Sequence, residues 1–126
     1  MKLSTLMAIK AVIVVVFGLG FILMPTTLMS FYGTELNAGG ALMTQLLGAS
    51  FILLGILLWL TKNAPGSEMA LRAIVLAVFV GDTIGFIVAL LGQLAGVANA
   101  LGWLTVALYL FLALGFGYFQ FAKSDA

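Results

Sequence analysis

The stretch AIVLAVFVGDTIGFIVA, residues 73–89, has a small residue at every fourth position and one acid among apolar neighbours. Small residues at this spacing on a helix form a shallow groove that lets another backbone come close, as helices do when they associate in lipid. We therefore expect a membrane-spanning helix that packs closely against another helix, either the second span of the same chain or the third span of a second chain. The expected packing positions are Ala73, Ala77, Gly81, Gly85 and Ala89.

The composition of the whole chain agrees with a membrane protein. Apolar residues make up 64% of the 126 residues and charged residues 7%, whereas a soluble domain has roughly 25% charged residues. A soluble chain of this length needs a polar exterior, which this sequence cannot provide. The formal charge of +1 argues against nucleic acid as a partner, because phosphate binding needs clustered Lys and Arg. We expect the lipid bilayer as the main partner.

Four apolar segments have about the ~20 residues needed to cross a bilayer. They predict one domain, an all-α integral membrane bundle of four transmembrane helices. Pro25 should break the first helix, because proline lacks a backbone N–H and disfavours helical geometry in the residue before it. We expect a short interfacial helix over residues 26–32, and a turn at Pro65-Gly66 with Ser67 as the cap of the third span. The expected spans are residues 6–24, 41–60, 69–91 and 101–121.

The basic residues predict the orientation of the bundle. With four spans, both termini and the loop between spans two and three lie on one side. That side carries all five basic residues, whereas the connectors on the other side carry only Glu35. Because basic ends stay cytoplasmic, we expect both termini in the cytoplasm. Lys10 is expected to extend its ammonium back to the headgroups. The basic residues are Lys2, Lys10, Lys62, Arg72 and Lys123.

Asp82, near the middle of the third span, is the strongest candidate for function. An ionised carboxylate at that depth is costly, so it must be paired, hydrated or protonated. Arg72 lies on the same helix ~15 Å away and is no partner. We expect partners on other spans at similar depth, namely Gln45, Tyr109 and Thr105. This group is either a proton-linked or ligand-binding site that opens outward, or a hydrogen-bonded contact that fixes helix register.

The chain contains no cysteine and no histidine, which removes thiolate chemistry and the usual zinc sites. No metal and no cofactor is expected. The absence of a suitable nucleophile, of metal ligands and of paired acids argues against an enzyme.

Three segments carry a resemblance to known proteins: LLGASFILLGILLWL (46–60), VGDTIGFIVALLGQLAG (80–96) and ALGWLTVALYLFLALGFGYF (100–119). Together they resemble the small four-span bacterial integral membrane proteins of unknown function. The resemblance implies a multi-pass protein of the bacterial inner membrane and implies no activity.

Two functions remain open. The first is a non-enzymatic structural, accessory or lipid-interacting membrane protein that associates with itself or with a membrane partner protein. The alternative is a subunit of a small oligomeric proton-coupled transporter or channel that uses Asp82.

Overall fold

A computed structural model describes residues 1–63 and 68–122, and all regular structure within these residues is helical. Four helical stretches in this part of the chain are long and apolar enough to cross a membrane. They are α1 (Leu3–Leu23), α3 (Ala38–Thr61), α4 (Glu68–Leu94) and α5 (Gly102–Gly117), which is extended by the short π-helical segment η1 (Tyr118–Ala122). The predicted all-α bundle with four potential membrane spans is confirmed. The turn at Pro65-Gly66 and the Ser67 cap lie outside the described residues.

The first span ends where Pro25 predicts. Helix α1 stops at Leu23, and Pro25 opens the short helix α2 (Pro25–Phe31). Proline suits the first position of a helix, because its missing N–H would have no partner there in any case. The side-chain amide of Gln45 in α3 donates a hydrogen bond of 3.1 Å to the carbonyl of Ile22. Gln45 therefore satisfies a backbone acceptor at the end of α1.

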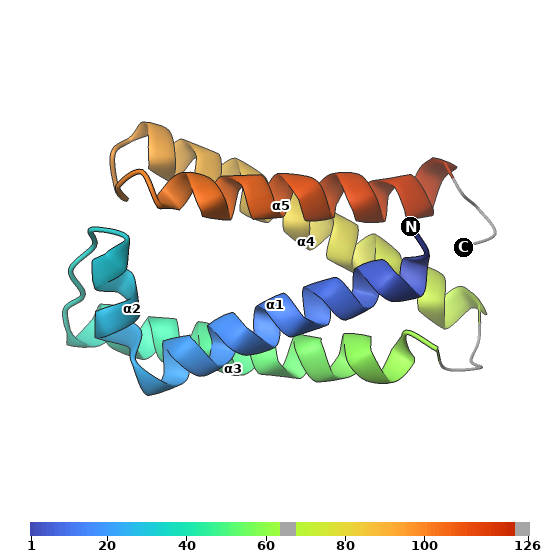
Figure 1. Ribbon diagram of the computed structural model, residues 1–126, viewed down its shortest axis with the longest axis horizontal. Helices are drawn as coiled ribbons and strands as arrows, with labels where there is room; N and C mark the ends of the chain where they lie inside the picture. Colours follow the sequence, from blue (N-terminus) through green and yellow to red (C-terminus); the bar gives the residue numbers. More distant parts are fainter. Residues whose placement is uncertain (64–67, 123–126) are drawn as a thin grey trace.

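The four long helices form two hairpins, α1 with α3 and α4 with α5 (Figure 1). Glycines bring α1 and α3 together: a Cβ at Gly18 would lie 2.8 Å from the carbonyl oxygen of Gly48. A Cβ at Gly55 would lie 3.1 Å from the carbonyl oxygen of Ala11. The close backbone contact therefore joins the first and second spans.

The small-residue stripe on α4 does not pack as expected. A Cβ at Gly81 would meet no atom within 4 Å, and Ala73 and Ala77 are exposed. Of the five stripe positions, Gly85 and Ala89 face the interior. Gly85 lies against the ring of Tyr109. Four residues advance a helix by about 40° more than a full turn, so a five-member stripe spreads over ~160° of its surface. One neighbour cannot cover that arc, so the first three positions have no close partner in the described part of this chain, and packing against a second chain stays a prediction.

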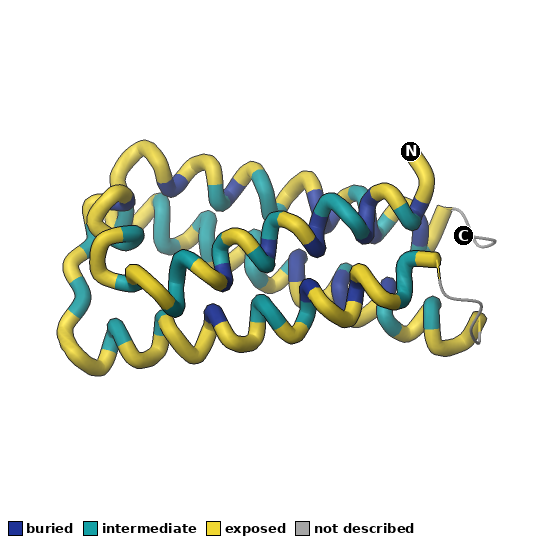
Figure 2. Tube along the Cα trace, turned by 60° about the horizontal axis from the view of Figure 1, so that its bottom comes forward, coloured by how far each residue is buried: buried dark blue, intermediate teal, exposed yellow. Residues whose placement is uncertain are grey.

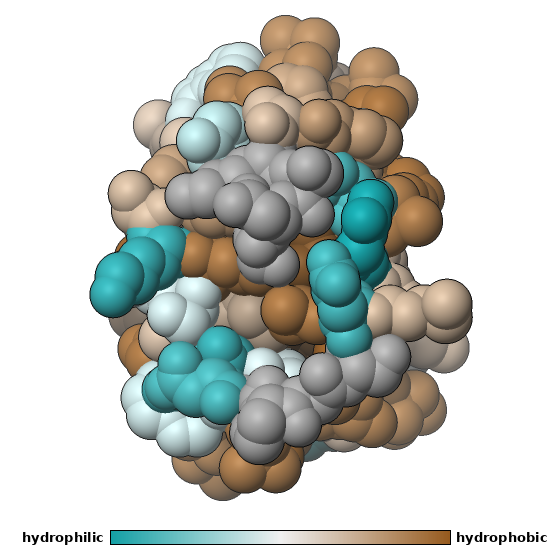
Figure 3. All heavy atoms as spheres, turned by 90° about the vertical axis from the view of Figure 1, so that its right-hand side faces the viewer, coloured by the Kyte–Doolittle hydropathy of each residue, from teal (hydrophilic) through white to brown (hydrophobic). Residues whose placement is uncertain are grey.

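The two ends of the bundle are built differently. We call the end where α1 begins and η1 stops the terminal end, and the end with α2 and the α4–α5 connector the connector end (Figure 1). Buried residues concentrate toward the terminal end (Figure 2), and hydrophilic side chains gather on its face (Figure 3). The packed core contains Leu3, Leu6, Met7, Ala11, Leu58, Val75, Val78, Leu112, Phe116 and Phe119.

Candidate ligand site

A buried ion pair joins the two hairpins. The ammonium Nζ of Lys10 in α1 lies 2.5 Å from Oδ1 of Asp82 in α4. Lys10 is 4% exposed and Asp82 2%. Because α1 begins at Leu3, Lys10 lies two turns inside the helix, ~10 Å from its start. The expectation that its ammonium returns to the headgroups is therefore wrong, and Lys10 is not one of the interfacial charges.

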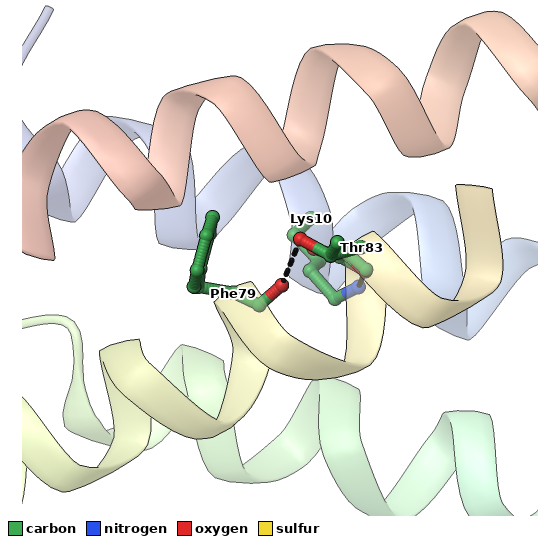
Figure 4. A network of polar contacts seen from close by, with 4 residues as sticks. Lys10, Phe79 and Thr83 are labelled. Atoms are coloured by element: carbon green, nitrogen blue, oxygen red, sulfur yellow. Dashed lines mark hydrogen bonds and ion pairs between the residues drawn. The ribbon is translucent and has the colours of Figure 1, made fainter. Parts of the chain in front are cut away.

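The pair leaves part of its hydrogen-bonding capacity unused. Asp82 Oδ2 is buried and has no hydrogen-bond partner in the described part of the chain. Within the same residues, Lys10 uses one of its three N–H groups, the bond to Asp82. Figure 4 shows Lys10 reaching α4 beside Thr83, whose hydroxyl donates to the Phe79 carbonyl at 2.8 Å. A buried polar atom left unpaired costs about 1–3 kcal/mol, so this site can accept a further polar group.

Lys10 also lines a cavity of about 420 Å³ between the two hairpins. On α1 the lining extends from Lys10 to Phe21, which corresponds to ~16 Å along the helix axis. The cavity is therefore long and narrow, and Lys10 alone is charged among the described residues that line it. Its volume falls within the ~300–1,000 Å³ of small-molecule pockets. The apolar wall includes Ile13, Val14, Phe17, Phe21, Leu47, Phe51, Val88, Leu108 and Leu112.

The structure brings two of the predicted site residues into this cavity. Tyr109 and Thr105 both line it. The ring of Tyr109 lies against Gly85, one turn along α4 from Asp82. Thr105 lies nearer the connector end, where its hydroxyl donates to the Tyr32 hydroxyl at 3.2 Å. Two of the residues that the sequence singles out therefore line the cavity from α5, and their role in a site stays a prediction.

Gln45 does not meet Asp82, and that expectation is wrong. Its amide bonds to Ile22 in α1 instead. The face of α3 that carries Gln45, Gly48 and Gly55 packs on α1. It is α1, through Lys10, that supplies the partner of Asp82. Matching residues by depth therefore found a polar group at a plausible level but on the wrong helix.

Hydrogen bonds tie the hairpins together at the connector end. The backbone N–H of Asn99 donates to the Tyr32 carbonyl at 2.8 Å, and the side-chain amide of Asn99 donates to the Phe31 carbonyl at 3.1 Å. Thr34 donates to the Val97 carbonyl at 3.1 Å. Gly33 has φ of +74° and no Cβ, so the Asn99 side chain fits against it. The cavity therefore lies between this polar contact and the packed core.

Sequence reasoning missed Lys10, Tyr32 and Asn99 as site residues. For Lys10 a signal was present, because it and Asp82 are opposite charges within two different apolar segments. For Tyr32 and Asn99 the contacts join residues far apart in the chain, and no local pattern predicts them. Among residues 1–63 and 68–122, no cluster of three His, Cys, Asp or Glu side chains could hold a metal ion.

Comparison of the chain with protein-family models, with curated proteins and with solved structures gives no match. Any activity must therefore be inferred from the geometry of the chain itself.

Proposed function

We propose that this chain is a non-enzymatic membrane protein that binds a lipid-like molecule in the cavity between its hairpins. The observation that supports this proposal is the 420 Å³ cavity, whose lining is mostly aliphatic and aromatic. Ligand pockets typically combine such walls with a few polar groups that orient the ligand. Here those groups are Lys10 and Tyr109 at one end, which we call the floor of the cavity, with Asp82 paired to Lys10 behind the lining.

We further propose that the chain resides in a bacterial inner membrane with its terminal end in the cytoplasm. Lys2, Lys62 and Arg72 lie toward the terminal end and Glu35 toward the connector end, which supports this orientation even without Lys10. The cavity then lies in the outer half of the bilayer. We also propose self-association, for which the exposed Ala73 and Ala77 leave a small-residue surface uncovered.

A proton-coupled transporter or channel subunit that uses Asp82 is the second candidate. It is favoured by the position of a buried carboxylate beside a cavity. However, Lys10 neutralises that carboxylate, and the packed core fills the terminal half of the bundle. Transport would require these groups to separate, whereas binding uses the cavity as it stands. We therefore place ligand binding first.

A cavity-filling substitution tests the proposal. Ala89 lines the cavity and Ala77 is exposed on the same helix, so Ala89→Phe and Ala77→Phe form a matched pair. The purified chain is titrated in detergent with the fluorescent lipophile N-phenyl-1-naphthylamine. We expect saturable binding that Ala89→Phe weakens by about tenfold or more, because the new ring occupies the space of the ligand, while Ala77→Phe leaves it unchanged. Non-saturable partitioning that is equal in all three proteins would refute a ligand cavity.

A further inference from the structure

We infer that the cavity takes a neutral long-chain lipid whose hydroxyl or carbonyl head group rests on the Lys10 ammonium, with its chain directed toward the connector end. This inference rests on the proposed ligand cavity and adds the chemistry and direction of the ligand. It follows from which polar groups at the two ends of the cavity already have partners and which do not.

The floor of the cavity has unused donors and acceptors. Two of the three Lys10 N–H groups have no protein partner among the described residues. Asp82 Oδ2 likewise has no hydrogen-bond partner there. Both side chains are more than nine-tenths buried. The Tyr109 hydroxyl also makes no hydrogen bond to the described part of the chain, and its ring lies one turn from Asp82. A ligand hydroxyl or carbonyl oxygen can accept from the Lys10 ammonium, which lines the cavity.

At the connector end of the cavity, each polar side chain in the lining makes at least one hydrogen bond within the described part of the chain, and none of them is charged. The Tyr32 hydroxyl accepts from Thr105 at 3.2 Å, and the Gln93 amide donates to the Asn99 carbonyl at 2.9 Å. Thr44 donates to the Gly40 carbonyl at 2.9 Å. The charged donor with unused N–H groups lies at the floor, and a hydrogen bond to a charged group is roughly twice as strong as a neutral one, so the floor binds a polar head group better. The apolar wall between the two ends suits an extended hydrocarbon chain.

The charge balance selects a neutral head group. Lys10 and Asp82 cancel, and no other lining residue in the described part of the chain is charged. A carboxylate ligand would leave one net negative charge in a low-dielectric region, and an uncompensated charge there is costly. An alcohol or a carbonyl adds no charge and still accepts a charge-assisted hydrogen bond from the ammonium.

The test compares the displacement of N-phenyl-1-naphthylamine by hexadecan-1-ol, hexadecane and hexadecanoate at pH 8. The ratio of the hexadecane to the hexadecan-1-ol dissociation constant isolates the head group. For the wild-type chain we expect this ratio to be roughly tenfold or more, as for a hydrogen bond to a charged group. In Lys10→Met/Asp82→Leu, which replaces the whole pair by apolar side chains, we expect the ratio to fall to about that of detergent partitioning alone. Tyr32→Phe removes a hydroxyl from the connector end of the same cavity and so distinguishes the two ends, because a head group at the floor does not contact it.

Each outcome decides one part of the inference. A ratio that survives in the double variant, or that falls in Tyr32→Phe, places the head group at the connector end and overturns the inference. Tighter binding of hexadecanoate than of the alcohol overturns the neutral class. If the double variant does not fold, Tyr109→Phe takes its place. An unchanged ratio in Tyr109→Phe would then contradict the placement of the head group at the floor of the cavity. Failure of every ligand to displace the probe refutes the proposed function itself, whereas equal displacement by alkane and alcohol refutes only the head-group assignment.

Discussion

The terminal and connector halves of the bundle join the same two hairpins by different means. In the terminal half, side chains from both hairpins interdigitate, and Leu6, Met7, Leu58 and Phe116 are fully buried. Glycine permits this contact, since a Cβ at Gly115 in α5 would lie 2.8 Å from Leu6 in α1. In the connector half, hydrogen bonds through residues 31–34 and 97–99 hold the hairpins together at the far end, with a cavity beneath them.

This difference teaches where glycine matters in such a bundle. Gly18 and Gly48 bring α1 onto α3, and Gly85 receives Tyr109 from α5, so these glycines act within a hairpin. Gly115 acts between hairpins, and it lies in the terminal half. In the connector half, Gly33 meets Asn99 of the other hairpin only at the far end, and the space between that contact and the terminal half stays hollow. The Lys10–Asp82 pair marks the boundary between the two halves.

The largest effect is expected at this boundary. Asp82→Leu alone leaves the Lys10 ammonium buried without a partner, and breaking such a pair costs about 3–5 kcal/mol. Lys10→Met/Asp82→Leu removes both charges and should recover most of that loss. The measurement is unfolding in mixed micelles with increasing SDS, followed by far-UV circular dichroism. A single variant as stable as the double variant would show that the pair does not couple the hairpins.

The second-largest effect is expected when a phenylalanine is replaced by alanine, and the loss of stability should differ between the two halves. Phe116→Ala in the packed core should destabilise the fold by about 3 kcal/mol, because the neighbours cannot collapse into the space. Phe17→Ala changes a partly buried ring that already borders the cavity, so we expect about 1 kcal/mol or less. The same SDS titration measures both variants. Equal losses would mean that the connector half is packed as tightly as the terminal half.

Most of the fold could be predicted from the sequence, because its signals are local. Apolar length places the spans, and Pro25 places the break between α1 and α2 within a residue or two. Three of the helices, α1, α3 and α4, nevertheless begin before the expected spans, and α1 starts at Leu3 instead of residue 6. Because of this earlier start, Lys10 lies two turns inside the helix, and its ammonium lies in the interior of the bundle instead of at the membrane interface.

The site could be predicted only in part, because depth in the membrane does not tell which helices are neighbours. Asp82, Tyr109 and Thr105 were identified by depth, and the last two line the cavity. Gln45 has a suitable depth, but its face of α3 packs on α1. The cavity itself arises where contacts between hairpins are missing, and no residue pattern marks a missing contact. The position of the cavity therefore follows only from the arrangement of all four spans.

The smallest expected effect concerns the closure of the connector end. Asn99→Ala removes two side-chain hydrogen bonds, one to the Phe31 carbonyl and one from the Leu101 N–H, each of which contributes about 0.5–1.5 kcal/mol. Asn37→Ala is the matched control, since Asn37 caps α3 by accepting from the Gly40 N–H and makes no bond between hairpins. Stopped-flow release of N-phenyl-1-naphthylamine should become a few-fold faster in Asn99→Ala and remain unchanged in Asn37→Ala. Because the connector half is held by few polar contacts, loosening one of them should open the cavity without unfolding the core. A loss of global stability in Asn99→Ala as large as in Phe116→Ala would contradict that division between the halves.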